Sequence, residues 1–202
     1  MAKLLVLFAH PVLEKSRVHT RLLRHIQHLP DIYIHDLYES YPDLDIDVER
    51  EKKLLLDHDV IIFQHPFYWY SAPAIVKQWM DLVLEHNWAY GANGKMLVGK
   101  RVFNAISSGG KKEAYCSTGN NRFTIPQLLA PFEQTAILCG MKYLPPFVVH
   151  GTHRLPEADM EMYAVQYEQL LLSLAHDRIT EDEYKNVHYL NELIPIPEQV
   201  QS

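Results

Sequence analysis

The segment His65–Pro73 (HPFYWYSAP) carries four consecutive aromatic residues between two prolines, directly after the apolar run Asp59–Gln64. The stretch between the prolines is too short and too constrained for a helix or a strand, so some rings must line a cleft. A flat ligand suits such a surface, and backbone N–H groups among the rings could hydrogen-bond the edge of a tricyclic ring such as a flavin. A rigid subunit interface is the alternative, and the two interpretations are compatible.

A second loop with chemical potential is HPVLEKSRVHT, which follows the first apolar run of the chain. Ser16 can cap a helix that starts here, and the backbone N–H groups of Arg17, Val18 and His19 would then form an anion site at its positive end. A cap without a ligand is the simpler interpretation. Neither Gly-x-Gly-x-x-Gly nor the P-loop pattern occurs, which argues against a dinucleotide fingerprint and a nucleotide triphosphatase.

The third loop is SSGGKKEAYCSTGNN, which begins at Ser107. Gly109 and Gly110 allow a close backbone approach to a ligand or a positive φ, and Ser107 and Ser108 can hydrogen-bond a ligand edge. Tyr115 offers a phenolic donor. A flexible glycine turn is the alternative.

The elements that must position these loops alternate between strand and helix. Continuous apolar runs predict buried strands, and apolar residues at helical spacing, such as Leu22 and Ile26, predict helices. The expected strands are 3–9, 31–37, 60–64, 101–107 and about 143–151; the expected helices are 21–29, 48–58, 73–86, 126–140 and about 156–175. Pro73 suits the first turn of its helix, and Gly140 suits a helix end.

This alternation predicts an α/β domain with a doubly wound, five-stranded parallel sheet and helices on both faces. Ligands of such folds bind outside the carboxyl ends of the strands, where all three loops lie. We expect residues 1–176 to form this domain. Residues 177–202 are expected to form an arm that packs on the domain or on a second subunit, with disorder as the alternative.

Composition excludes several classes of function. The chain has 202 residues and a formal charge of -6, and its 19 Lys and Arg are scattered, which argues against nucleic acid and against a polybasic membrane anchor. The N-terminal apolar run is too short for a signal peptide, so we expect a cytoplasmic protein. The two cysteines form no Cys-x-x-Cys pair and the histidines no zinc motif, so no metal site is expected.

The segments AHP…SRVH, HPFYWYSAPAIVKQWMD, WAYG, SSGG…Y…GNN and LAPFEQTAILCGMKYLPPFVVHG together resemble the flavodoxin-like NAD(P)H:quinone oxidoreductases related to DT-diaphorase. The chain is most similar to the ancillary oxidoreductases of bacterial glutathione-gated potassium efflux systems. The resemblance runs from about Lys3 to the last predicted helix and leaves the tail outside.

This resemblance implies a non-covalently held FMN, with FAD as the alternative flavin, and NADPH or NADH as reductant. It also implies a homodimer with active sites at the interface. Carried over by position, the turn that holds the flavin phosphate would consist of Ser16, Arg17, Val18 and His19, with His10 beside it. The segment that faces the flavin ring would consist of Pro66, Phe67, Tyr68, Trp69 and Tyr70. The other edge of the ring would be bordered by Ser107, Ser108, Gly109 and Gly110, and the active-site tyrosine would be Tyr115.

Two positions depart from the family. His19 replaces an asparagine at the end of the phosphate turn, although it can still donate a hydrogen bond. The active-site histidine of DT-diaphorase corresponds to Asn121, and an amide cannot exchange protons near neutral pH. The family's tyrosine–histidine pair therefore cannot be transferred, and proton supply would fall to Tyr115, water or the flavin.

Two functional hypotheses follow. The first is an enzyme that passes hydride from NAD(P)H through a flavin to a quinone or a similar flat electrophile, in a ping-pong reaction. The second is a regulatory flavin-binding subunit at the inner face of the membrane, on a potassium efflux transporter, with incidental turnover.

Overall fold

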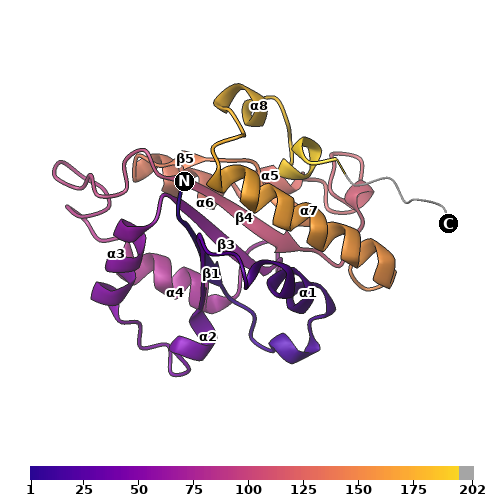
Figure 1. Ribbon diagram of the computed structural model, residues 1–202, viewed down its shortest axis with the longest axis horizontal. Helices are drawn as coiled ribbons and strands as arrows, with labels where there is room; N and C mark the ends of the chain where they lie inside the picture. The colour runs from indigo at the N-terminus through magenta and orange to yellow at the C-terminus, as the bar shows by residue number, and fades with distance from the viewer. Residues whose placement is uncertain (196–202) are drawn as a thin grey trace.

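The computed structural model describes residues 1–195, which form a parallel sheet covered by helices on both faces (Figure 1). The strand order is β2-β1-β3-β4-β5, and β6 also pairs with β4. The strands are β1 (Leu4–Phe8), β2 (Ile32–Asp36), β3 (Val60–Pro66), β4 (Arg101–Ser107), β5 (Lys142–Tyr143) and β6 (Phe147–Val149). The predicted doubly wound, flavodoxin-like sheet is confirmed.

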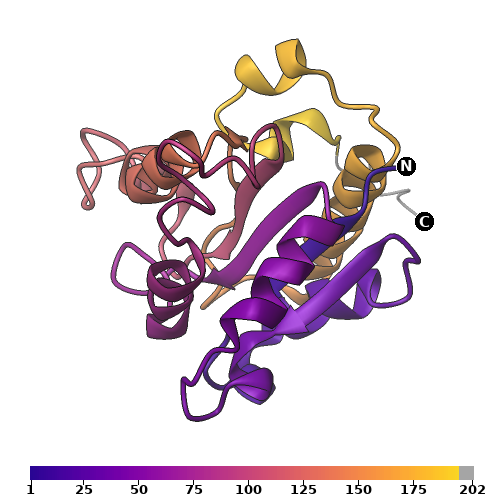
Figure 2. The ribbon, with the colours of Figure 1, turned by 90° about the vertical axis from the view of Figure 1, so that its left-hand side faces the viewer.

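Strands β1, β3, β4 and β6 contribute side chains to two hydrophobic cores, because alternate side chains point to opposite faces. On β1, for example, Leu5 and Leu7 enter one core while Leu4, Val6 and Phe8 enter the other. Helices α1 (Arg17–Ile26) and α7 (Glu157–Ala175) cover the second core; α2 (Leu37–Ser40), α3 (Val48–Asp57), α4 (Ala74–Val83), α5 (Ile125–Leu128) and α6 (Ala130–Leu138) cover the first (Figures 1 and 2).

The fifth strand position is divided into β5 and β6. Val102 pairs with Tyr143 and Ala105 with Phe147, so the edge chain carries one residue more than β4 between these pairs. Pro145 and Pro146 lie in this interval, and neither has an N–H group to donate to a ladder. The expected single strand is therefore interrupted without leaving the sheet.

The segment expected as one helix over 126–140 is also divided. The chain turns at Leu129 between α5 and α6, and Pro131 lies in the first turn of α6. Gly140 follows the end of α6 with a φ of 71°, a left-handed conformation that glycine adopts without a side-chain penalty.

The C-terminal segment packs on the domain as far as the structure describes it. It contains α8 (Glu181–Lys185) and a 3₁₀ turn at Leu190–Leu193, and it lies along the upper edge of the domain in both views (Figures 1 and 2). Asn191 Oδ1 accepts from the N–H of Val148, and the Gln166 amide donates to the carbonyls of Asn191 and Ile194. The boundary between domain and arm stays a prediction, and its last residues, 196–202, lie outside the described part. None of the helices within residues 1–195 is long and apolar enough to cross a membrane.

Candidate active site

The three predicted loops begin at one edge of the sheet, because the strands before them end in register. Phe8 pairs with Gln64, and Pro66 pairs with Ser107. The backbone N–H of Phe67 also donates to the carbonyl of Ser107, at 2.8 Å. The loop after β1, the aromatic loop after β3 and the serine–glycine loop after β4 therefore share the carboxyl edge.

Aromatic contacts join these loops to one another. The rings of His10 and Tyr68 lie 6.3 Å apart, edge to face, and those of Phe67 and Tyr115 lie 6.1 Å apart. The Tyr70 hydroxyl donates to Asn121 Oδ1 at 3.3 Å. Residues from all three predicted loops thus contact one another at this edge.

The aromatic segment ends in a tight turn with unusual backbone angles. The N–H of Ser71 donates to the carbonyl of Tyr68 at 3.0 Å, and the two central residues, Trp69 and Tyr70, have φ of 51° and 63°. Positive φ at both central positions is typical of a type I′ turn, which normally uses Asn and Gly. A bulky residue in this region costs roughly 1–2 kcal/mol. Trp69 is 92% exposed, so packing of its own ring does not compensate for that cost.

The loop after β1 ends in the predicted helix cap. Ser16 Oγ accepts from the backbone N–H of His19 at 3.1 Å. The N–H groups of Arg17 and Val18 lie in the first turn, where the helix offers them no acceptor, so they are available to an anion. The Arg17 guanidinium is paired with Glu157 at 2.6 Å on the surface.

The two histidines of this region have fixed hydrogen bonds. His10 Nδ1 accepts from the N–H of Val12 at 3.1 Å, and burial lowers the pKa of His10. The His19 side chain is fully buried and contacts Ser107 Oγ through Nε2 at 2.9 Å. Burial lowers the pKa of His19 well below its usual value, so the ring is neutral near pH 7.

The loop after β4 closes tightly around its own neighbours. A Cβ on Gly109 would lie 2.4 Å from His153 Nε2, and one on Gly110 would lie 3.0 Å from the Tyr115 ring. Neither glycine has a positive φ. Of the two expected uses of this pair, close approach applies, but the groups approached are side chains of the protein.

His150, which no motif in the sequence predicts as a site residue, lies beside Tyr115. The two ring centroids are 6.0 Å apart, and His150 Nδ1 lies 3.3 Å from Ser108 Oγ. Burial lowers the pKa of His150 to about 4 and raises the pKa of Tyr115. His150 directly follows β6, at the same carboxyl edge as the predicted loops, and this position is the signal that could have revealed it.

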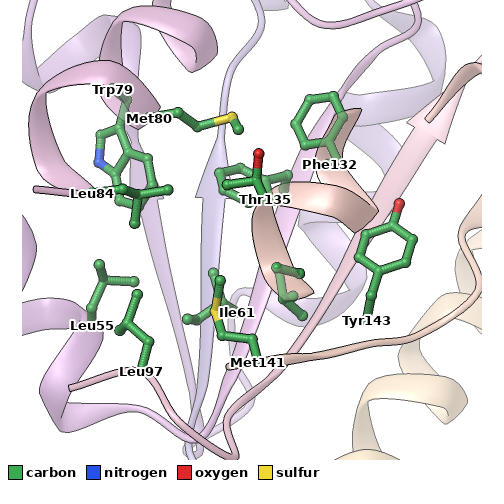
Figure 3. A pocket seen from close by; sticks show the side chains of 13 residues that line it. Leu55, Ile61, Trp79, Met80, Leu84, Leu97, Phe132, Thr135, Met141 and Tyr143 are labelled. Atoms are coloured by element: carbon green, nitrogen blue, oxygen red, sulfur yellow. The ribbon is translucent and has the colours of Figure 1, made fainter. Parts of the chain in front are cut away.

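Figure 3 shows an apolar cavity that is separate from this edge. It lies in the first core, between the sheet, α4 and α6, with Trp79, Leu84 and Tyr143 among its lining residues. Its volume is about 10 Å³, enough for about one water molecule. Within residues 1–195, no three His, Cys, Asp or Glu side chains gather as metal ligands would.

Residues 2–171 match the protein family described as having a flavodoxin-like fold. The chain belongs to this family. The resemblance inferred from the motifs is confirmed.

Alignments with several flavodoxin-like relatives extend over most of this chain with substantial sequence identity. The glutathione-regulated potassium-efflux system ancillary protein KefG of Pectobacterium carotovorum is 42% identical over 85% of this chain and 93% of its own. General stress protein 14 of Treponema denticola, solved in complex with FMN, has a TM-score of 0.82 and 38% identity over 85% of this chain and 99% of its own. An NADPH-quinone reductase of P. pentosaceus has a TM-score of 0.76 and 35% identity over 83% of this chain and 96% of its own.

Proposed function

We propose that this flavodoxin-like protein is an FMN-dependent NAD(P)H:quinone oxidoreductase whose active site lies at the carboxyl edge of the sheet. The observation that carries the proposal is the exposed aromatic turn at Trp69. The residues before it, Tyr68 and Phe67, contact His10 and Tyr115, and His150 packs beside Tyr115. The FMN complex and the NADPH-quinone reductase among the similar structures support the cofactor and the reaction.

The residues present suit FMN. The free N–H groups of Arg17 and Val18 would receive its phosphate, with His10 beside it. The aromatic segment Pro66–Tyr70 would face the ring, and Ser107–Gly110 would border its other edge. When bound, FMN would supply two-electron chemistry, taking hydride from NADPH or NADH and delivering it to a quinone. FMN is preferred to FAD because the solved relative carries FMN.

The protein's own task is to position the substrates and to supply a proton. The aromatic turn would orient donor and acceptor rings by stacking. The phenol of Tyr115 would donate a hydrogen bond to the oxygen of a bound quinone, and water would replace any proton that the phenol gives up. Neutral His150 packs beside this phenol, whereas the residue at the family's usual histidine position is Asn121.

The test is spectroscopic. The purified protein is examined for oxidised-flavin absorbance, any bound chromophore is released and identified, and colourless protein is titrated with FMN. Anaerobic NADPH should then bleach the flavin bands, and a quinone should restore them at rates of about 1 to 1,000 per second. A protein that can be loaded with neither FMN nor FAD would refute the proposal.

We also propose a homodimer in which the aromatic turn contributes to the interface and a quinone binds between the subunits. Trp69, Tyr68 and Tyr70 all expose large rings in the single chain, and Phe123 of the neighbouring loop does so as well. Analytical ultracentrifugation of the wild type and of Trp69→Ala would test it, because the variant should dissociate at higher concentration.

The second candidate function is an ancillary subunit of a potassium efflux transporter, favoured by the similarity to KefG. On this hypothesis the protein is cytoplasmic and peripheral to the inner face of the membrane, and turnover is incidental. Co-purification with the transporter that persists without flavin and is lost after mutation of a surface element would support it. The two functions are compatible in one protein.

A further inference from the structure

Two buried hydrogen-bond chains cross the fold beneath the carboxyl edge of the sheet. Each begins at a tyrosine, continues through a side-chain amide on a central strand and reaches a neutral histidine. Gln64 and His65 are neighbours on β3 and point to opposite faces, so one chain lies in each layer of the fold. Neither chain is needed to close a helix or a strand.

The first chain joins α7, β3, α1 and β4. The Tyr167 hydroxyl donates to Gln64 Oε1 at 3.0 Å, Gln64 Nε2 lies 3.4 Å from His19 Nδ1, and His19 Nε2 lies 2.9 Å from Ser107 Oγ. Tyr167, Gln64 and His19 are each at most 1% exposed. Only Ser107, at the end of β4, reaches the partly open edge.

Tyr167 determines which groups donate and which accept along this hydrogen-bond chain. Among residues 1–195 its hydroxyl has one hydrogen-bond partner, the Gln64 amide. If the amide were reversed, the buried O–H of Tyr167 would have no acceptor, at a cost of roughly 1–3 kcal/mol. Gln64 must therefore present its oxygen to Tyr167 and its N–H to His19 Nδ1. A neutral His19 then carries its proton on Nε2 and donates to Ser107 Oγ.

The second chain is fixed from its other end. His65 Nδ1 lies 2.9 Å from the carbonyl of Pro66, which only accepts, so Nδ1 carries the proton. Asn104 Nδ2 then donates to His65 Nε2 at 3.1 Å, and the Tyr143 hydroxyl donates to Asn104 Oδ1 at 2.7 Å. The two histidines are therefore held in opposite tautomers.

The two serines at the end of β4 differ in what they can offer a ligand. The Ser108 hydroxyl donates to the carbonyl of Gly110 at 3.0 Å, so its proton is used within the loop. Ser107 Oγ instead accepts from His19, so its own proton is directed away from the buried chain. We propose that Tyr167 and Gln64 are positioning residues that act through His19 to hold Ser107 as a hydrogen-bond donor toward an acceptor atom of the bound ligand.

The donor–acceptor direction of the first hydrogen-bond chain follows from the unliganded protein alone, whereas its use in binding FMN rests on the proposed function. The two parts therefore need separate measurements. The first uses protein labelled with ¹⁵N-histidine at pH 7.5, without and with FMN. Long-range ¹H–¹⁵N spectra should show His19 protonated at Nε2 only and His65 protonated at Nδ1 only.

Tyr167→Phe should abolish the single tautomer of His19 and leave that of His65 unchanged. Tyr163→Phe is the matched control, because Tyr163 lies one turn earlier on α7 and has no side-chain hydrogen bond within residues 1–195. A wild-type His19 that is protonated at Nδ1, or at both nitrogens, would overturn the proposal. The wild-type spectrum needs no variant, so it tests the proposal even if Tyr167→Phe fails to fold.

The second measurement is a double-mutant cycle on FMN affinity. Ser107→Ala should weaken FMN binding about 2- to 10-fold, the range of one net hydrogen bond. Tyr167→Phe should weaken it by no more than that, and should have no further effect in the Ser107→Ala background. Additive losses would overturn the link between Tyr167 and Ser107. Absence of FMN binding by the wild type would instead refute the proposed function, and the tautomers would still decide the direction of the chain.

Discussion

Tyr115 and His150 lie against one another at the carboxyl edge of the sheet, with ring centroids 6.0 Å apart. The contact joins the loop after β4 to the end of β6. Phe67 also contacts Tyr115, so the phenol packs against both the aromatic loop and an imidazole whose pKa burial lowers to about 4. This imidazole is neutral near pH 7 and too weak an acid to supply a proton, which leaves Tyr115 as the group that would donate to a quinone.

Tyr115→Phe should therefore lower kcat for quinone reduction by about 10- to 100-fold. This loss is at or below the lower end of the roughly 100- to 10,000-fold that a positioned proton donor contributes. FMN affinity should change less than about 2-fold because the ring remains. The measurement is steady-state turnover at saturating NADPH and quinone. Tyr33→Phe, on the edge strand β2, is the control and should keep wild-type turnover. Unchanged kcat in Tyr115→Phe would remove its assigned role.

Trp69→Gly should stabilise the flavin-free monomer. Its φ of 51° is unfavourable for tryptophan and free of penalty for glycine, and its ring is 92% exposed. We expect the free energy of unfolding to rise by about 0.5 to 1 kcal/mol in urea denaturation, despite the entropy of glycine. The loss of ring stacking should weaken FMN binding by about 3- to 10-fold.

Trp69→Ala separates the two effects. Alanine removes the ring but retains the left-handed strain, so FMN binding should weaken similarly without a gain in stability. Equal stability of the glycine and alanine variants would show that the turn is not strained by residue 69. The strain would then lie elsewhere in the Tyr68–Ser71 turn.

The sequence predicted the sheet, its order of elements and the edge where the loops meet, because buried parallel strands read as unbroken apolar runs. It did not predict that Trp69 and Tyr70 adopt left-handed angles, since turn rules assign these positions to glycine and asparagine. The division of the fifth strand could have been inferred from Pro145 and Pro146, which lack N–H groups.

Other features depend on tertiary contacts between distant segments. His150 gains its meaning only from the packing of β6 beside β4, which brings it to Tyr115. Glu51 lies in a strongly charged helical segment that local pattern assigns to the surface, yet it is fully buried. Glu51 therefore carries no local signal, and the only signal for His150 is its place at the end of a strand.

Glu51 is a stability centre on which three donors converge. Its carboxylate accepts from Tyr41 and from Trp79 Nε1 at 2.7 Å, and contacts His35 Nε2 at 2.7 Å. Glu51→Gln replaces an acceptor by an N–H₂ that faces these donors, and should cost about 2 to 4 kcal/mol of unfolding free energy. Glu49→Gln, exposed on the same helix, should change stability by less than about 0.5 kcal/mol. Urea denaturation of both variants decides; similar values for the two would contradict a buried network.

Stability should fall between pH 6.5 and pH 4 because of the buried histidines. Burial lowers the pKa of His65 from 6.5 to about 4, so the unfolded chain binds a proton in this interval that the folded chain refuses. Folded-state stability is thus full above pH 6.5 and is lost as pH falls toward 4, by about 3 kcal/mol for His65 at about 1.4 kcal/mol per pKa unit. His19, whose pKa burial also lowers, adds in the same direction.

The carboxylate of Glu51 affects folding stability in a lower pH range than the histidines do. Burial alone would raise the pKa of Glu51, but hydrogen bonds from His35, Tyr41 and Trp79 lower it, so its contribution is lost only at more acidic pH. Urea denaturation at pH 7.5, 6.5, 5.5 and 4.5 measures the histidine effect. His65→Asn, which cannot titrate, should start from lower stability but show a shallower slope, whereas exposed His28→Gln should keep the wild-type slope. A wild-type slope in His65→Asn would mean that His65 is not the group that takes up the proton.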